Sequence, residues 1–269
     1  MGVPRMCEAQ LRIICREALK DGFTRFKVKI GEELEDDKRR LEIIREEIGW
    51  ENLLVLDASA GWDQNEAIHW MKELAGFRPL WVLEPTSSDD ILAHMAIAEE
   101  LRPLHVGVAV NCHNKIMFKQ YIQKKTVSCC FLDPFRIGGV NEVLAICLMA
   151  AKFKVPVCIE ARVPGAAELA QHLLFWEYIS VSGSLSKRMC AAVTHRHIHQ
   201  HFQQPAMTKW ASYFLPQNPG CNTEMKSESL LEYEFPIGQK WQHLVRSPKY
   251  WKSSRIPDWI ENRCFPVTF

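Results

Sequence analysis

Apolar and polar positions follow two alternating patterns along most of the chain. Amphipathic segments with apolar residues every three or four positions predict helices, for example over residues 11–19 and 34–48. Between such segments lie short apolar runs, which are typical of strands in a parallel sheet covered by helices on both faces. The runs recur at intervals of about 22 to 28 residues and span Phe26–Ile30, Leu53–Asp57, Trp81–Glu84, His105–Ala109, Ser128–Asp133, Pro156–Glu160 and Tyr178–Val181.

This α/β alternation fits either a (β/α)8 barrel or an open doubly wound sheet. The regular interval favours the barrel, although spacing alone leaves both folds open. Residues 1–7 are too short and too rich in Pro and Gly for a first barrel strand, so we expect a barrel without that strand and with two exposed edges. We predict a barrel domain over residues 8–190, a segment with a helix near Ala192–Phe202 and irregular structure over 191–245, and a basic, aromatic tail over 246–269.

The composition is that of a globular protein with an ample core. Of 269 residues, 47% are hydrophobic, and 33 Lys and Arg balance 32 Asp and Glu to give a net charge of +1. This balance argues against a nucleic-acid partner, and the longest apolar stretch, Val143–Ala151, is too short to cross a membrane. The ten cysteines include no CxxC pair and are expected to be reduced and mostly buried. No targeting pattern is visible, so we expect an intracellular protein, cytoplasmic or mitochondrial. A homo-oligomeric state is one possibility that the sequence leaves open.

Charged residues gather where the predicted strands end, which is where the loops of a β/α barrel form its active site. Lys27 and Lys29 are two positions apart and therefore point to one face of their strand. Repulsion between the two ammonium groups makes one of them easier to deprotonate and so a candidate general base. Acids near these lysines could provide oxygen ligands for Mg²⁺, so the pattern predicts a site in which a carboxylate substrate binds to a metal ion. The simpler alternative is that each acid caps the helix that follows its strand. The acids at later strand ends are Asp57, Glu84, Asp133 and Glu160.

The motifs at these strand ends occur in a recognisable order. They are Lys27-Val28-Lys29, Leu56-Asp57-Ala58, Leu83-Glu84-Pro85-Thr86, Asp133 with Arg136-Ile137-Gly138-Gly139-Val140, and, later, Ala211-Ser212-Tyr213 and Thr223-Glu224-Met225-Lys226. The series resembles the enolase superfamily, most closely the L-fuconate dehydratase branch of its mandelate racemase subgroup, over roughly residues 8–245. The resemblance implies Mg²⁺-dependent dehydration of a sugar acid, such as L-fuconate, to a 2-keto-3-deoxy acid. It also implies an α+β capping domain ahead of the barrel, which we expect this chain to lack.

The resemblance assigns a role to each matching position. Lys29 corresponds to the base that removes the proton next to the substrate carboxylate, and Lys27 is its neighbour. Asp57 corresponds to the first metal ligand, and Asp133 to the carboxylate that orients a catalytic histidine. Glu168 corresponds to an acid on the substrate side of the last loop.

Several positions depart from the pattern that the resemblance implies. Leu83 stands where a second, glutamate metal ligand is expected, and residues 110–114 contain no acid where a third is expected. Glu160 stands in place of the catalytic histidine and would face Asp133 as a like charge. A shifted metal site made from Glu84, Glu160, Asn111 and Asp133 is an alternative. We therefore expect dehydration to be weak or lost, or the chain to be a non-catalytic pseudoenzyme with a partner-binding or regulatory role.

Alternate histidines near residue 200 suggest a second metal hypothesis. His195 and His199 would share one face of a helix, and His197 and His201 another, at a spacing that Zn²⁺ ligands use. The simpler interpretation is a solvated, polar helix end.

Overall fold

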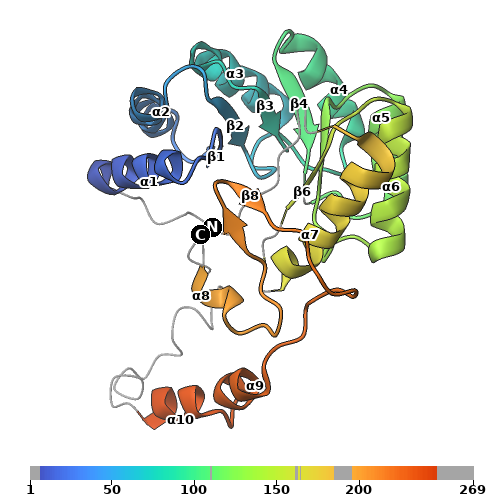
Figure 1. Ribbon diagram of the computed structural model, residues 1–269. Coiled ribbons are helices and arrows are strands. Elements are labelled where there is room, and N and C mark those ends of the chain that lie inside the picture. The colour runs from blue at the N-terminus through green and yellow to red at the C-terminus, as the bar shows by residue number, and fades with distance from the viewer. Residues whose placement is uncertain (1–6, 110, 161–162, 164, 185–195, 247–269) are drawn as a thin grey trace.

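Six parallel strands form the main sheet of the protein, whose computed structural model describes residues 7–109, 111–160, 163, 165–184 and 196–246 (Figure 1). The strands pair in chain order, each with the next, and every connection between them carries a helix. This arrangement confirms the α/β class and a truncated barrel sheet. The strands are β1 (Arg25–Lys29), β2 (Leu53–Asp57), β3 (Trp81–Leu83), β4 (His105–Val108), β5 (Cys129–Leu132) and β6 (Val157–Ile159).

Helices cover the outside of this sheet, and polar side chains fix where several of them begin. The side chain of Asp63 accepts a hydrogen bond from the N–H of Glu66, and Asn114 caps the next-but-one helix in the same way. Such caps satisfy N–H groups that have no partner within the first helical turn. The helices are α1 (Glu8–Lys20), α2 (Leu34–Ile48), α3 (Gln64–Leu74), the 3-10 turn η1 (Ala75–Phe77), α4 (Ile91–Glu100), α5 (Lys115–Gln123), α6 (Val140–Lys152) and α7 (Ala166–Glu177).

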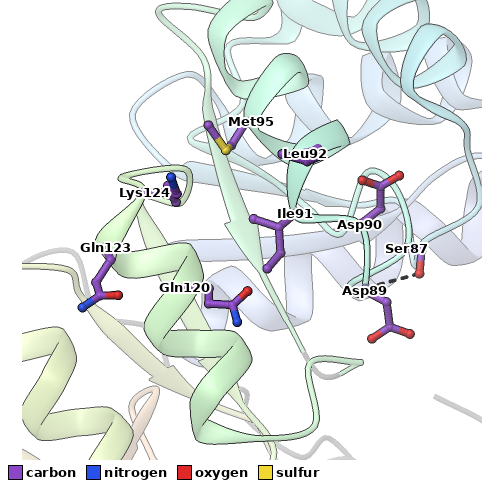
Figure 2. Close-up of a pocket in the computed structure, with 9 residues that line it drawn as sticks. All are labelled: Ser87, Asp89, Asp90, Ile91, Leu92, Met95, Gln120, Gln123 and Lys124. Carbon is purple, nitrogen blue, oxygen red and sulfur yellow. Dashed lines mark hydrogen bonds between the residues drawn. The ribbon is translucent and has the colours of Figure 1, made fainter.

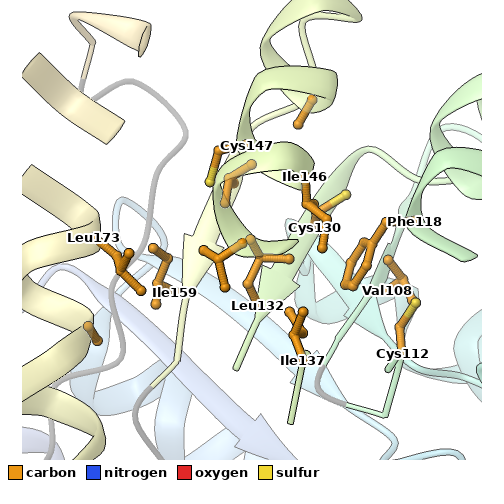
Figure 3. Packing of buried hydrophobic residues seen from close by; sticks show 14 of the residues in the cluster. Val108, Cys112, Phe118, Cys130, Leu132, Ile137, Ile146, Cys147, Ile159 and Leu173 are labelled. Atoms are coloured by element: carbon orange, nitrogen blue, oxygen red, sulfur yellow. The ribbon is translucent and has the colours of Figure 1, made fainter. Parts of the chain in front are cut away.

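Two apolar layers use opposite faces of the strands. Leu132 and Ile159 point outward and pack against Ile146 and Cys147 of α6 (Figure 3). The strand residues that alternate with these outward-pointing ones point to the inside of the curved sheet, because successive side chains of a strand lie on opposite faces. This inner layer is fully packed and consists of Val55, Trp81, Leu83, Ala109, Cys129, Phe131 and Cys158.

The seventh predicted strand, Tyr178–Val181, is wrong. These residues belong to a π-helical turn, η2 (Tyr178–Ser182), that continues α7 and ends at Gly183 with a φ of 58°. An apolar run of four residues suits a helix as well as a strand, and periodicity cannot separate the two. Ile179 is 68% exposed in this turn, so the run does not extend the buried sheet beyond β6.

The C-terminal part of the described chain crosses the side that the sheet leaves open. Its hairpin turns at Trp210 and Ala211, both with positive φ, and a Cβ built on Gly22 would lie only 3.5 Å from the carbonyl carbon of Trp210. Ala206 and Tyr213 pack instead with the apolar cluster beneath α5, α6 and α7. The segment therefore contacts both ends of the sheet (Figure 1). Its elements are α8 (Arg196–His199), β7 (Thr208–Lys209), β8 (Ser212–Tyr213), α9 (Ser227–Tyr233) and α10 (Gln239–Arg246).

The helix predicted near Ala192–Phe202 is described only in its second half, as α8, because residues 185–195 lie outside the described part. The limits of the three predicted segments stay predictions. None of the helices in the described residues is long and apolar enough to cross a membrane.

Candidate active site

An ammonium group and two carboxylates meet inside the curved sheet. Lys27 Nζ lies 3.2 Å from Asp57 Oδ2 and also donates a hydrogen bond to Glu160 Oε1. The two acids are buried, with side chains 0% and 1% exposed, while 23% of the Lys27 side chain reaches solvent. The cluster is thus an almost enclosed ion-pair network with one partly accessible member.

Strand register explains why these side chains share the interior. Lys27 is opposite Val55 in β2, whose side chain belongs to the inner layer, and Lys29 is opposite Asp57. Glu160 follows the last residue of β6 and is two positions from the inward-facing Cys158. Because β1 and β6 are the first and last strands of the sheet, the contact between Lys27 and Glu160 shows that the sheet curves until its ends face each other.

Asp57 is held from two sides. Its Oδ1 accepts hydrogen bonds from the backbone N–H and the hydroxyl of Ser59, at 3.0 and 3.1 Å. Its Oδ2 accepts from Lys27. Ser59 and the following Ala60 both have positive φ, so the turn after β2 is bent tightly around the carboxylate. Both oxygens of the predicted metal ligand are therefore engaged by donors of this chain.

The neighbouring strand end brings together a buried apolar side chain and a buried acid. Leu83 is fully buried in the inner layer with Val55 and Phe131. Glu84 instead accepts hydrogen bonds from Asn111, from its N–H at 2.6 Å and its side-chain amide at 2.8 Å. It also accepts one from Ser88 at 3.0 Å. Glu84 consequently orders the loop after β4.

A polar network links Asn111 to Glu84, a pair that the alternative, shifted metal site had grouped, and to Arg136, which the sequence did not indicate. Besides its two bonds to Glu84, Asn111 accepts a hydrogen bond at 2.8 Å from Arg136 in the loop after β5. Three successive strand-end loops are thereby linked. Nothing in the sequence marked Arg136 as a partner of Asn111, because the two residues lie on different loops and share no motif.

Asp133 follows the last residue of β5 and Glu160 follows the last residue of β6, and the residues before them, Leu132 and Ile159, pair in the parallel register. One oxygen of Asp133 accepts the N–H of Phe135 at 2.9 Å, which shapes the loop toward α6. Glu160 is bound by the ammonium of Lys27, so the charge of this acid is balanced from the opposite end of the sheet.

Glu168 occupies the first turn of α7 and is completely buried. Its Oε1 accepts hydrogen bonds from His199 Nδ1 at 2.6 Å and from the N–H of Ala206 at 3.2 Å. The residue predicted to contact substrate thus attaches the C-terminal segment to α7. Its role toward a substrate stays a prediction.

The alternate histidines make separate contacts where the structure describes them. His199 binds Glu168, whereas His201 Nδ1 lies 3.0 Å from the hydroxyl of Ser229. His195 lies outside the described residues, and the side chain of His197 is likewise not described. His199 therefore joins the C-terminal segment to α7, whereas His201 joins two parts of that segment to each other.

The donor set of the interior does not fit Mg²⁺. This ion requires near-octahedral coordination by oxygen, and its protein sites use carboxylates that are free to bind it. Here Asp57 is engaged on both oxygens, and the next strand contributes the apolar Leu83. Among the residues that the structure describes, no three His, Cys, Asp or Glu side chains are grouped to hold a metal ion. The shifted site that includes Glu84 and Glu160 stays a prediction.

A groove of about 660 Å³ lies outside the barrel, between α4 and α5 (Figure 2). None of the predicted site residues lines it. Its walls consist of Ser87, Asp89, Asp90, Ile91, Leu92, Met95, Gln120, Gln123 and Lys124.

The parallel β/α units, with lysines and acids at the inner strand ends, define a barrel of the enolase type. Residues 10–229 match the family described as enolase C-terminal domain-like, and the chain belongs to this family. It is 50% identical over 244 residues to mitochondrial enolase superfamily member 1 of Xenopus laevis, covering 90% of this chain and 54% of that protein. It is 42% identical over 233 residues to the L-galactonate dehydratase of Hypocrea jecorina, covering 85% of this chain and 51% of that enzyme.

Solved structures agree with these relationships. The crystal structure of human mitochondrial enolase superfamily member 1 superposes with a TM-score of 0.86 at 46% identity, covering 91% of this chain and 55% of that one. The fold is shared with L-talarate/galactarate dehydratase of Salmonella typhimurium, a protein crystallised with Mg, at a TM-score of 0.71 and 20% identity. The chain spans about half the length of the curated relatives it matches.

Proposed function

We propose that this chain is a sugar-acid dehydratase-like barrel in which the inherited reaction, dehydration of an acid such as L-fuconate, is weak or lost. Relatives with 42 to 50% identity, one of them an L-galactonate dehydratase, support the reaction class. The observation that carries the proposal is the cluster of Lys27, Asp57 and Glu160. The lysine of the family pattern is present, but its ammonium group forms ion pairs with the two acids.

The retained and replaced groups have different consequences for the chemistry. Lys29 lies opposite Asp57 on the inner face and is the group we assign as the base that removes the proton next to the substrate carboxylate. Expulsion of the 3-hydroxyl needs an acid, and the resemblance placed a histidine at position 160. Glu160 instead forms an ion pair with Lys27. Loss of one general acid lowers a rate by about 10²- to 10⁴-fold.

A second function, without catalysis, is favoured by a specific observation. Leu83 and Phe131 fill the interior next to the charged cluster with packed apolar side chains. A barrel retained for a partner-binding or regulatory role needs this stability but no reactive site. Its location in mitochondria or cytoplasm, and a homo-oligomeric state, stay predictions.

The test is a dehydration assay of the purified chain with L-fuconate and Mg²⁺, in which the 2-keto-3-deoxy acid is measured. We expect slow product formation that disappears in Lys29→Met, with the exposed Lys72→Met as matched control. Turnover that survives Lys29→Met contradicts the assignment of the base. No product above the uncatalysed reaction, from a cooperatively folded chain, favours the non-catalytic function instead.

A further inference from the structure

The outer helix α4 has no charged face along most of its length. Residues 91–98 contain one histidine and no Asp, Glu, Lys or Arg, and charges appear only at Glu99 and Glu100. A helix at the surface of a globular protein normally presents polar residues to water, and a helix that is apolar all round is typical of a buried position. Leu92 is nevertheless 76% exposed, more than any other leucine, isoleucine or valine that the structure describes. The composition of α4 therefore indicates that another surface covers this face.

The groove between α4 and α5 carries opposite charges at its two ends. Asp89 and Asp90 lie just before α4, whereas Lys124 is the C-cap residue of α5. Each helix leads from one parallel strand to the next, so the two helices run in the same direction and these charges lie at opposite ends of the groove (Figure 2). With 10 residues in α4, the ends are about 15 Å apart. Leu92 and Met95 provide apolar surface between them.

Other charges near this face are already paired within the chain. Lys72 of α3 lies 2.5 Å from Glu100 at the far end of α4, and Lys115 of α5 lies 3.1 Å from Glu142. Within the part of the chain that the structure describes, Lys124 belongs to no such pair. Its ammonium group is therefore available to an acid of another molecule.

This arrangement of charges is complementary to itself. When two copies of a chain meet about a two-fold axis, the same surface is used by both, so each end of the groove in one copy faces the opposite end in the other. Asp89 of each copy then faces Lys124 of the other, and the apolar residues between them pack against their equivalents. A partner of another sequence would have to supply both charges independently.

We propose that the face formed by α4 and α5 binds a second copy of this chain in a two-fold symmetric dimer. The apolar surface of Leu92 and Met95 provides the centre of the contact, and the pairs between Asp89 and Lys124 fix its orientation. The proposal concerns the outside of the barrel and involves none of the groups assigned to dehydration.

Sedimentation velocity of the purified chain tests the contact. The wild-type protein should change from monomer to dimer as its concentration rises from about 1 to about 200 µM. Leu92→Asp should remain monomeric, because the contact would bury a carboxylate without a partner. The acid lies in the first turn of α4, where the helix dipole favours it, so the fold should be kept. Leu148→Asp is the matched control, since this leucine of α6 is 55% exposed outside the groove and should leave the dimer unchanged.

Two charge reversals distinguish a second copy from any other occupant. Lys124→Asp and Asp89→Lys each place like charges opposite one another at both ends of the dimer, and each should weaken association by about 5- to 30-fold. An equimolar mixture of the two variants should associate as the wild type does, because each end of the mixed dimer again joins an acid to a lysine. Lys152→Asp, in the last turn of α6 and outside the groove, should have no effect. These surface changes also keep the test decisive if Leu92→Asp does not fold.

Three results would overturn the proposal. The first is a wild-type chain that stays monomeric over the whole range, which would leave the face to another kind of partner. The others are a Leu92→Asp variant that dimerises as the wild type does, and a mixture of the charge variants that associates no better than either variant alone. None of these measurements depends on turnover, so they are separate from the test of the proposed function.

Discussion

The buried carboxylate of Glu168 should hold the C-terminal segment against the barrel. The perturbation is Glu168→Ala, which removes the acceptor of the hydrogen bonds from His199 at 2.6 Å and from the Ala206 N–H at 3.2 Å. Glu168 is 0% exposed and Ala206 only 8%, so water does not readily replace the lost partner. The residues that follow, including the hairpin against Gly22, depend on this attachment.

The magnitude follows from these two contacts. An N–H left buried without an acceptor costs about 1 to 3 kcal/mol, and a bond to a charged group contributes about 1.5 to 3 kcal/mol. The second oxygen of Glu168 is buried without a partner among the described residues, so removing the carboxylate also relieves a desolvation cost. The net loss in the free energy of unfolding should be about 2 to 4 kcal/mol.

The assay combines thermal denaturation with hydrogen exchange read by mass spectrometry. Glu168→Ala should lower Tm by roughly 5 to 15 °C, and amides of residues 199–213 should lose protection before those of the six strands. Glu73→Ala is the control, because this exposed acid pairs only at the surface with Lys38 and should change the free energy of unfolding by less than about 0.5 kcal/mol. An unchanged Tm together with unchanged exchange over 199–213 would refute the reasoning.

Three further predictions concern other buried polar groups. Burial lowers the pKa of His94 below its ordinary 6.5, so the unfolded chain binds a proton at this histidine more readily than the folded chain does. The free energy of unfolding should therefore fall as pH decreases from 7 to 5. Urea denaturation should show a smaller fall for His94→Phe than for the wild-type protein. Glu84→Gln places an amide against the donors of Asn111 and should cost about 1 to 3 kcal/mol in the same assay, and a neutral result would contradict the described network. Arg45 is 5% exposed and donates four hydrogen bonds to backbone carbonyls, so Arg45→Met should lower the free energy of unfolding by about 2 to 4 kcal/mol, with Arg39→Met as an exposed control that should have almost no effect.

The candidate site shows which contacts can be predicted from the pattern of residues along the strands. Alternation along β1 places Lys27 and Lys29 on one face, and the parallel order brings Asp57 to the same edge of the sheet. The carboxyl ends of parallel strands share one side of a barrel, so these neighbours follow from local sequence. The partners of Glu168 do not, because His199 and Ala206 belong to a segment whose path over α7 is set by its packing.

The sequence by itself determined the six strands, their covering helices and the direction in which the strand-end side chains point. Those features depend on short-range periodicity and on burial of one face, which residues close in sequence specify. Tertiary structure alone decided that Tyr178–Val181 is a π-helical turn and that Lys27 binds Glu160. A short apolar run has no intrinsic preference strong enough to fix its conformation, and an ion pair across 133 residues requires the curvature of the whole sheet.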